Sequence, residues 1–363
     1  MKYLFITTSS YTVLSFRKNL ITYLLKNGHS VCVICGDENC RFQIENIGAL
    51  FFLCKMNNRS LNPFNELKYI SGLKKLIKEI KPDCLFSFQL KPNLYGSVIA
   101  HHYGIVRIFS MIEGVGDAFS KTGFTGLISK LYIINRYKKS FKYCKNVFFL
   151  NNSDKNFFIT KKMISKEKPV LINGIGVDLN YFASKNVKNY KNFIMISRML
   201  VSKGVFDYCE CARIVKQKYP DTVFNYLGLE GDIDLKDIDG YVKSGFINYL
   251  GFCMDVRPFL QECSALILPS YYGEGLPMSI MEAESVGRCI ITTDSVGCRD
   301  TIIDGYNGLL VSKKDPCSIA KACIYLIEHP DEIIRFGANA RKFAEKNWDS
   351  TKINESIYQI ISK

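Results

Sequence analysis

Short apolar segments alternate with longer segments of helical period from the start of the chain. The apolar runs are rich in β-branched and aromatic residues and predict strands at 3–7, 31–34, 50–53, 84–88, 106–110 and 146–150. Amphipathic segments lie between them and predict helices at 16–26, 66–80, 94–102 and 127–141. Because parallel strands are joined by right-handed helical crossovers, this alternation predicts a parallel, doubly wound, Rossmann-like sheet.

The alternation stops at a stretch of glycines and polar residues and then begins again. Residues 173–192 open with Asn173-Gly174-Ile175-Gly176 and predict a connection between two domains. Beyond them, strands are predicted at 193–197, 222–227, 265–268 and 289–292, helices at 205–218, 277–286 and 316–328, and a helical tail from Asp331. We therefore expect an α/β protein with two doubly wound domains that face a central cleft, where ligands bind beyond the strand carboxyl ends.

The composition indicates a globular protein whose basic charge is concentrated in its first half. Of the 363 residues 47% are apolar and 23% charged, which is enough to bury a core in two domains. Residues 1–180 hold 26 Lys and Arg against 11 Asp and Glu, whereas residues 181–363 hold 22 against 23. The first domain is therefore expected to meet a polyanion, which leaves nucleic acid, an anionic membrane or a phosphorylated substrate.

Cysteine usage and hydropathy indicate a protein of a reducing compartment. Cys32 and Cys35 lie inside a predicted strand and no second pair stands at zinc spacing, so the thiols are expected to be buried and reduced. The N-terminus does not resemble a secretory signal, and no window approaches the roughly 18 apolar residues of a spanning helix. We expect a cytoplasmic protein whose membrane contact, if it has one, is peripheral.

Two cations follow the first strand of the second domain. Arg198 ends that strand and Lys203-Gly204 opens the next helix, which puts both cations beside backbone N–H groups that favour anions. A diphosphate would fit there. The alternative is that both are solvated loop charges.

A glycine-bracketed turn with one carboxylate follows the strand at 265–268. In Gly273-Glu274-Gly275-Leu276-Pro277 the glycines permit close approach to a ligand, and proline favours the start of the helix that follows. That helix would offer its first N–H groups to phosphate. Glu282 lies in its apolar stretch and is either on the solvent face or held to accept hydroxyl hydrogen bonds.

Together these motifs resemble the C-terminal domain of family 4 glycosyltransferases over about residues 190–345. The resemblance rests on Arg198, Lys203-Gly204, Glu274-Gly275-Leu276-Pro277, Glu282-Ala283, Gly297-Cys298-Arg299-Asp300 and Asp304-Gly305-Tyr306-Asn307-Gly308, in that order. The first domain is similar to a bacterial branch of the family at Ser60-Leu61-Asn62-Pro63-Phe64, Lys91-Pro92-Asn93 and Glu113-Gly114-Val115-Gly116. The family has the GT-B fold and retains anomeric configuration, and this branch adds an α-linked N-acetylhexosamine or hexose to undecaprenyl-diphosphate-linked sugars.

The resemblance implies a role for each matched residue of the second domain. Arg198 and Lys203 would grip the donor diphosphate and stabilise it as a leaving group, without a metal ion or other cofactor. Glu274 would hold the hydroxyls of the transferred sugar, and Glu282 those of the ribose. The residues lining the sugar, phosphates and base would be Gly275, Leu276, Pro277, Met278, Ser279, Gly251 and Phe252.

The first domain is expected to bind the acceptor. Many family members carry a glycine pair after the first strand and a histidine near the donor sugar, but this chain has Ser9-Ser10 and Ile112-Glu113-Gly114 at those places. Glu113 is therefore a candidate for orienting or deprotonating the acceptor hydroxyl, with an ordinary loop carboxylate as the alternative. The remaining expected acceptor residues are Lys91, Asn93 and Gly114.

Two basic stretches of the first domain, 130–142 and 74–78, interleave cations with apolar residues. Such stretches lie on anionic lipid, or they are helices that pack an apolar stripe inward beneath solvated lysines. The expected organisation is an acceptor- and membrane-facing domain at 1–172, a linker at 173–192 and a nucleotide-sugar-binding domain at 193–345. A C-terminal helix at 346–363 is expected to pack back on the first domain.

The sequence thus predicts a metal-independent, retaining glycosyltransferase at the cytoplasmic face of the inner membrane. Its donor is expected to be UDP-linked N-acetylgalactosamine, N-acetylglucosamine or galactose, and its acceptor a polyprenyl-diphosphate-linked saccharide of O-antigen, capsule or N-glycan assembly. One alternative is transfer of another hexose or deoxyhexose from a GDP- or UDP-donor to a soluble or glycolipid acceptor. Others are a metal-dependent transferase using Asp232 and Asp234, and a nucleic-acid-binding protein using the basic domain.

Overall fold

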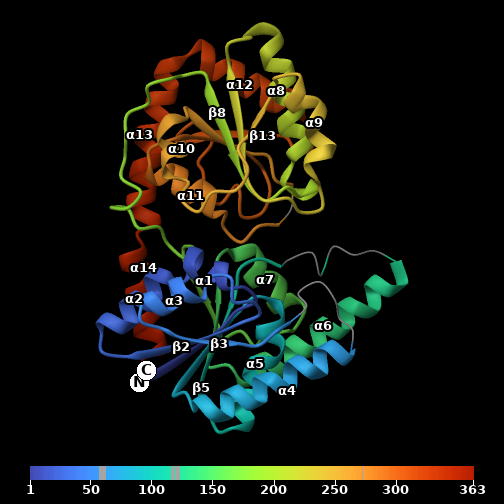
Figure 1. Cartoon of the computed structure of the whole chain (residues 1–363), viewed down its shortest axis with the longest axis vertical. Helices are drawn as coiled ribbons and strands as arrows, with labels where there is room; N and C mark the ends of the chain where they lie inside the picture. The colour runs from blue at the N-terminus through green and yellow to red at the C-terminus, as the bar shows by residue number, and fades with distance from the viewer. Residues whose placement is uncertain (57–62, 116–118, 120–122, 272) are drawn as a thin grey trace. The chain divides into compact units, whose positions relative to one another are not determined.

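The chain folds into two compact units in the computed structural model, which describes residues 1–56, 63–115, 119, 123–271 and 273–363 (Figure 1). The first unit comprises Met1–Ile175 and Ser350–Lys363, and the second comprises Gly176–Asp349. Ser60, Leu61, Asn62 and Gly116 of the family-like motifs lie outside the described residues.

The first unit is built on a seven-stranded parallel sheet of order β3-β2-β1-β4-β5-β6-β7. Its strands are β1 (Lys2–Ile6), β2 (Ser30–Cys35), β3 (Leu50–Leu53), β4 (Cys84–Phe88), β5 (Arg107–Ile112), β6 (Asn146–Phe149) and β7 (Pro169–Leu171). Its helices are α1 (Ser10–Phe16), α2 (Lys18–Lys26), α3 (Arg41–Asn46), α4 (Pro63–Ile80), α5 (Leu90–His102), α6 (Gly123–Tyr143), α7 (Asn152–Thr160) and α14 (Ser350–Ile361). The strand order runs outward from β1 in both directions, which is the doubly wound arrangement the sequence predicts.

Helices cover both faces of this sheet. β4 is buried along its whole length, as expected of a central parallel strand covered on both faces. The core of one face joins sheet residues such as Leu85 to Tyr69 of α4, Tyr95 of α5 and Ile133 of α6. The last helix, α14, packs against α2, and the hydroxyl of Tyr358 lies 2.9 Å from Nε2 of His29. The N- and C-termini therefore belong to the same unit.

The second unit is a six-stranded parallel sheet of order β10-β9-β8-β11-β12-β13. Its strands are β8 (Asn192–Ile196), β9 (Val223–Leu227), β10 (Asn248–Tyr249), β11 (Ala265–Leu268), β12 (Cys289–Thr293) and β13 (Gly308–Val311). Its helices are α8 (Val205–Lys218), α9 (Leu235–Lys243), α10 (Arg257–Glu262), α11 (Met278–Ser285), α12 (Pro316–Glu328) and α13 (Pro330–Asn347), preceded by the 3-10 turn Val201–Lys203. This sheet is also doubly wound, about β8 and β11.

A buried carboxylate stabilises the second unit. Glu284 of α11 accepts a hydrogen bond from Asn307 Nδ2 at 2.6 Å and another from Trp348 Nε1 at 2.5 Å. Burial raises the pKa of Glu284 well above its ordinary value. Glu284 therefore ties α11 both to Asn307, which belongs to the family-like motif, and to Trp348 at the end of α13.

The thiols of Cys32 and Cys35 are free and buried in β2, as expected, whereas Cys317 is exposed. Within the part of the chain that the structure describes, no helix is both long enough and apolar enough to span a bilayer.

Candidate active site

The loops after β8 and β11 share one edge of the second sheet. The two strands pair in parallel, so their carboxyl ends meet at that edge. The first loop carries Arg198 and Lys203, and the second carries Glu274. Tyr271 N donates to Ser202 O at 3.1 Å, so the two loops are bonded to each other. The structure thus brings together three predicted site residues.

Lys203 and Glu274 form an ion pair. Lys203 Nζ donates to Glu274 Oε1, and the same oxygen accepts a hydrogen bond from Ser270 Oγ at 2.9 Å. The side chains are 19% and 15% exposed, so both retain surface that a ligand can reach. Charge-assisted bonds of this kind fix the orientation of both groups.

Arg198 lies on the same loop as an exposed cation. Among the described residues, its guanidinium has no hydrogen-bond or ion-pair partner. A planar guanidinium in that state can bind two oxygens of a diphosphate at once. The site therefore offers one compensated cation and one that is open to an anion.

Two glycines let these loops approach one another closely. Gly204 has φ +76°, and a Cβ there would lie 2.3 Å from Pro269 O. Gly297 has φ +84°, and a Cβ there would lie 2.4 Å from Glu274 O. A side chain at either position would displace the backbone that carries Lys203 or Glu274.

The helix after Glu274 presents a polar face and N–H donors at the same edge. Ile280 and Ala283 of α11 are buried in the core, which leaves Met278, Ser279 and Glu282 half-buried on the other face. No described side chain caps the start of α11, so its first N–H groups are available to an anion. The structure places Gly275, Leu276 and Pro277 in the buried turn before this helix.

Glu282 connects this helix to the loop after β10. Burial of its carboxyl raises its pKa to about 8, and the nearby Asp255 carboxylate adds to the shift. Asp255 is held by Arg257, whose Nη2 donates to it at 2.6 Å. The same loop begins with Gly251 at φ +72° and Phe252, whose side chain is 43% exposed. Because no described residue hydrogen-bonds the Glu282 carboxyl group, it is available to ligand hydroxyls.

In the first unit, Glu113 follows β5 and forms an ion pair with Arg17. Arg17 is buried, and its guanidinium lies 4.0 Å from the centre of the Phe88 ring. Burial lowers the pKa of Arg17 to about 9. Glu113 is 18% exposed and is followed by Gly114 at φ +141°. Sequence reasoning missed Arg17, because a single arginine in an amphipathic segment carries no signal of its partner.

The other two predicted acceptor residues are buried. Lys91 is 3% exposed and its Nζ donates to Glu66 Oε1 at 2.5 Å. Asn93 is fully buried, accepts from Ser87 Oγ at 2.8 Å and donates to Met111 O at 2.8 Å. In this structure they tie α5 to α4 and to the central strands, so their direct contact with an acceptor stays a prediction.

The aspartates of the metal-dependent alternative have local structural roles. Asp232 Oδ1 accepts a hydrogen bond from Val201 N at 3.0 Å, and Asp234 N donates to Asp237 at 2.8 Å at the start of α9. Among the described residues, no group of three His, Cys, Asp or Glu side chains is arranged to hold a metal ion.

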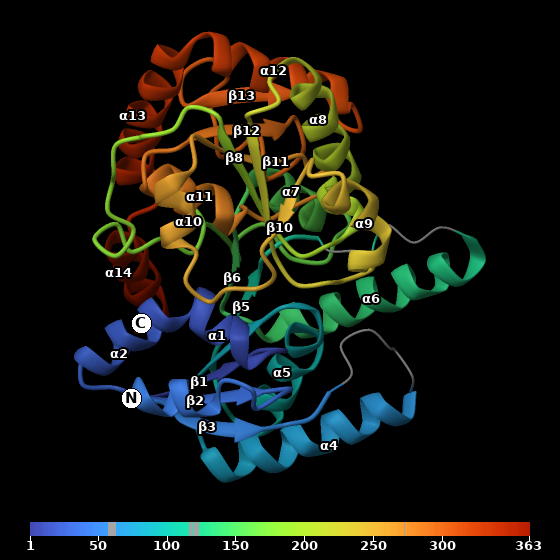
Figure 2. The same ribbon diagram turned by 45° about the horizontal axis from the view of Figure 1, so that its top comes forward.

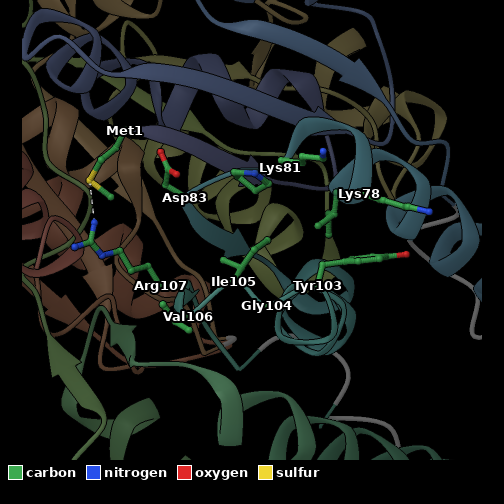
Figure 3. Close-up of a pocket in the computed structure, with 11 residues that line it drawn as sticks. Met1, Lys78, Lys81, Asp83, Tyr103, Gly104, Ile105, Val106 and Arg107 are labelled. Atoms are coloured by element: carbon green, nitrogen blue, oxygen red, sulfur yellow. Dashed lines mark hydrogen bonds between the residues drawn. The ribbon is translucent and has the colours of Figure 1, made fainter.

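A cavity of about 860 Å³ lies at the opposite edge of the first sheet (Figure 3). It is lined by residues at the amino ends of strands, including Met1 before β1, Asp83 before β4 and Arg107 at the start of β5. Parallel sheets bind substrates at their carboxyl edge, where Glu113 lies, so this cavity is at the edge opposite the predicted acceptor residue.

Comparisons with known proteins follow the division into two units. The family model "Glycosyl transferases group 1" matches residues 178–343, and "Glycosyl transferase 4-like" matches residues 2–145. The Campylobacter jejuni N,N'-diacetylbacillosaminyl-diphospho-undecaprenol alpha-1,3-N-acetylgalactosaminyltransferase is 28% identical, over 97% of this chain and 95% of its own length. The Escherichia coli UDP-Gal:alpha-D-GlcNAc-diphosphoundecaprenol alpha-1,3-galactosyltransferase is 25% identical over 73% of this chain and 72% of its own.

Solved structures share the fold over the whole chain. A glycosyltransferase from Rickettsia africae superposes with a TM-score of 0.79 at 19% identity, covering 99% of this chain and 97% of its own. Anabaena HepE, solved with UDP and glucose, superposes with a TM-score of 0.82 at 16% identity and full coverage of both chains. At this identity the likeness concerns the fold.

Proposed function

On the premise that the chain is a glycosyltransferase, 4-like in its first half and group 1 in its second, we propose that it glycosylates a polyprenyl-diphosphate-linked saccharide. The family, the GT-B fold and the enzyme class predicted from the sequence are confirmed. The C. jejuni relative, matched over nearly its full length, acts on a diphospho-undecaprenol acceptor, which supports this acceptor class. The E. coli relative takes UDP-Gal, which supports a UDP-sugar donor.

The proposal for donor binding is supported by the position of Arg198, Lys203 and Glu274 at one edge of the second sheet. The donor diphosphate would recruit both cations, and the hydroxyls of the transferred sugar would then bond to the Glu274 carboxylate. Glu282 would accept from the ribose hydroxyls. As the bond from the anomeric carbon to the diphosphate breaks, negative charge develops on the leaving group, and Arg198 and Lys203 stabilise it.

The acceptor half rests on Glu113 in the first unit. An acceptor hydroxyl bonded to Glu113 would be oriented toward the anomeric carbon, and its proton would pass to this carboxylate as the new glycosidic bond forms. Arg17 forms an ion pair with Glu113 and so holds its carboxylate in place. Retention of configuration and independence of metal remain predictions from the family resemblance.

We place the membrane contact at the amino ends of α4 and α6, which point the same way in both views (Figures 1 and 2). The side chains that form this apolar tip are exposed: Phe64 81%, Leu67 64%, Phe124 79%, Leu127 54%, Ile128 53% and Leu131 53%. The later part of α6 packs inward instead, with Ile133, Tyr137 and Phe141 buried. Exposed lysines such as Lys68, Lys74 and Lys138 would add attraction to anionic lipid at the inner leaflet.

The donor and the acceptor can be tested together. Purified protein is given UDP-GalNAc, UDP-GlcNAc, UDP-Gal or a GDP-hexose with a synthetic N-acetylhexosamine-diphosphate-polyprenol, with and without EDTA. We expect transfer from one UDP-sugar, unchanged by EDTA, to give an α-linked product by NMR. Absence of transfer, together with absence of thermal stabilisation by every nucleotide sugar, would refute the proposed function.

A further inference from the structure

Gln89 occupies a strained position at the carboxyl edge of the first sheet. It follows the central strand β4 and precedes α5, with φ +67° and ψ 174°. Residues other than glycine rarely occupy this region, and residues held there by the surrounding structure cluster at active sites and ligand-binding sites. The neighbouring strands are β1 and β5, and the loop after β5 carries Glu113.

The orientation of the Gln89 amide is determined by its partners. Its Oε1 accepts hydrogen bonds from Thr7 Oγ1 at 2.8 Å, Thr8 Oγ1 at 2.8 Å and Thr8 N at 2.9 Å. A backbone N–H can only donate, so the atom that faces Thr8 N must be the oxygen of the amide. The Nε2 group therefore points away from the β1 loop.

The other end of the Gln89 amide is its Nε2 group, which can donate two hydrogen bonds. None of the described residues accepts a hydrogen bond from it, and it is not among the unsatisfied side-chain atoms sealed from solvent. The side chain is half-buried, so three bonds fix one end of the amide while the other end stays accessible.

Glu113 lies at the same carboxyl edge of the sheet as Gln89, after the neighbouring strand β5. Phe88, the residue before Gln89, is the partner of Met111 in the pairing of β4 with β5. Glu113 stands two residues after Met111. Arg17 stacks on the Phe88 ring and forms an ion pair with Glu113. The carboxyl edge thus presents a hydrogen-bond acceptor on Glu113 and a donor on Gln89.

We infer that Gln89 is an acceptor-binding residue, whose Nε2 donates a hydrogen bond to an oxygen of the acceptor saccharide, an inference that rests on the proposed function. A sugar hydroxyl both donates and accepts. A fixed donor and a fixed carboxylate at one sheet edge can therefore orient a hydroxyl or a hydroxyl and acetamido pair.

The competing role for Gln89 is a structural tie between the β1 loop and β4, and one substitution separates the two. Gln89→Glu keeps an oxygen facing Thr7 and Thr8 but replaces the outward N–H donors with an acceptor. If Gln89 only links the β1 loop to β4, the variant keeps its function. If Gln89 Nε2 donates to the acceptor, the variant loses that hydrogen bond. Gln89→Gly relaxes the strained backbone and removes the donor as well, so it provides a folded comparison even where Gln89→Glu is unstable.

The experiment measures the acceptor KM, the donor-only hydrolysis rate and the thermal shift with UDP. We expect Gln89→Glu and Gln89→Gly to raise the acceptor KM about tenfold, as for one lost hydrogen bond, with hydrolysis and the UDP shift unchanged. A wild-type acceptor KM in either variant, with the protein folded, would overturn the inference. Failure of the wild-type enzyme to use any polyprenyl-linked acceptor would instead refute the proposed function.

Discussion

The Lys203 ammonium is bonded to the Glu274 carboxylate, although 71 positions separate the two residues in the chain. Each charge compensates the other while no ligand is bound, which limits the cost of partly burying both. In the proposed reaction, the donor diphosphate takes over Lys203 and the sugar hydroxyls take over Glu274. On the proposed function, the ion pair holds both side chains in place for the donor that replaces it.

Loss of either partner is expected to remove most of the activity. Lys203→Ala and Glu274→Ala should each lower kcat by about 10²-fold or more, because stabilisation of developing charge is lost. Melting temperature should stay close to wild type, since both side chains reach solvent. Lys218→Ala is the matched control, because Lys218 pairs with Glu328 at an exposed position of the same unit. A near-wild-type rate in either variant would remove that residue from the proposed site.

Glu282 is expected to make stability depend on pH. Burial raises its pKa from an ordinary value near 4.5 to about 8, so the folded state favours the neutral carboxyl group. The stability that neutral Glu282 contributes to the fold is fully present below the pKa of the unfolded state. It is lost as the pH rises through the pKa of the folded state. Because the side chain keeps some contact with water, we expect a loss on the order of 1 kcal/mol between pH 5 and 9.

The measurement is urea unfolding across that pH range. The Glu282→Gln variant should lose less stability between pH 5 and 9 than wild type, and it should be more stable than wild type at pH 9. The control Glu355→Gln, at an exposed position, should show the same pH dependence of stability as wild type. Identical pH profiles for wild type and Glu282→Gln would show that Glu282 ionises normally.

Gly297→Ala is expected to damage both stability and donor binding. The new Cβ would lie 2.4 Å from Glu274 O, and the backbone φ of +84° already disfavours a side chain. The expected loss is about 2 kcal/mol or more, with weaker UDP binding because the Glu274 turn must move. The control is Gly305→Ala. Gly305 has φ +70°, but no atom lies within 4 Å of the position of an added Cβ, so this substitution measures the cost of the backbone conformation alone. Equal losses of stability in the two variants would show that the contact between the new Cβ and Glu274 O costs nothing.

The fold was predictable where segments are long or strongly apolar. The strands at 50–53, 84–88 and 265–268 and the helices at 205–218 and 316–328 have the bounds predicted for them. Short elements were missed: α10 (Arg257–Glu262) has fewer than two helical turns and β10 (Asn248–Tyr249) only two residues. Such lengths carry no measurable period, and only the neighbouring elements determine their conformation.

The candidate site was predictable only where its residues lie in loops that follow predicted strands. Arg198, Lys203 and Glu274 lie in such loops, so the carboxyl-edge rule brings them together. The pairing of Arg17 with Glu113 depends on strand order and on the packing of α1 and α2, which the sequence does not reveal. Gln89 carries no local signal either, because its strained φ comes from tertiary contacts rather than from a glycine.

The apolar tip is expected to determine membrane binding. Leu127→Gln combined with Leu131→Gln should lower binding to anionic liposomes about 30-fold or more, because each removes roughly 1 kcal/mol or more of apolar burial. Activity on a short, water-soluble acceptor should be unchanged. Val106→Gln is the control, since Val106 is 80% exposed in the same unit but lies directly before β5, outside the apolar tip. Unchanged sedimentation with liposomes after the double substitution would place the lipid contact elsewhere.

The ion pair between Arg17 and Glu113 is expected to be structural as well as catalytic. Glu113→Gln leaves the buried Arg17 guanidinium without its counter-charge, so we expect a loss of about 3 kcal/mol in urea unfolding. The matched control is Glu45→Gln, whose partner Arg41 is 54% exposed and whose loss should stay below about 0.5 kcal/mol.

A second substitution then separates the two roles of Glu113. Arg17→Met in the Glu113→Gln background removes the unpaired buried charge and should restore much of the stability. Transfer to the acceptor should stay low in this double variant, because the carboxylate that takes the hydroxyl proton is still missing. Recovery of transfer along with stability would leave Glu113 a structural role alone, and the proposed acceptor chemistry would need another base.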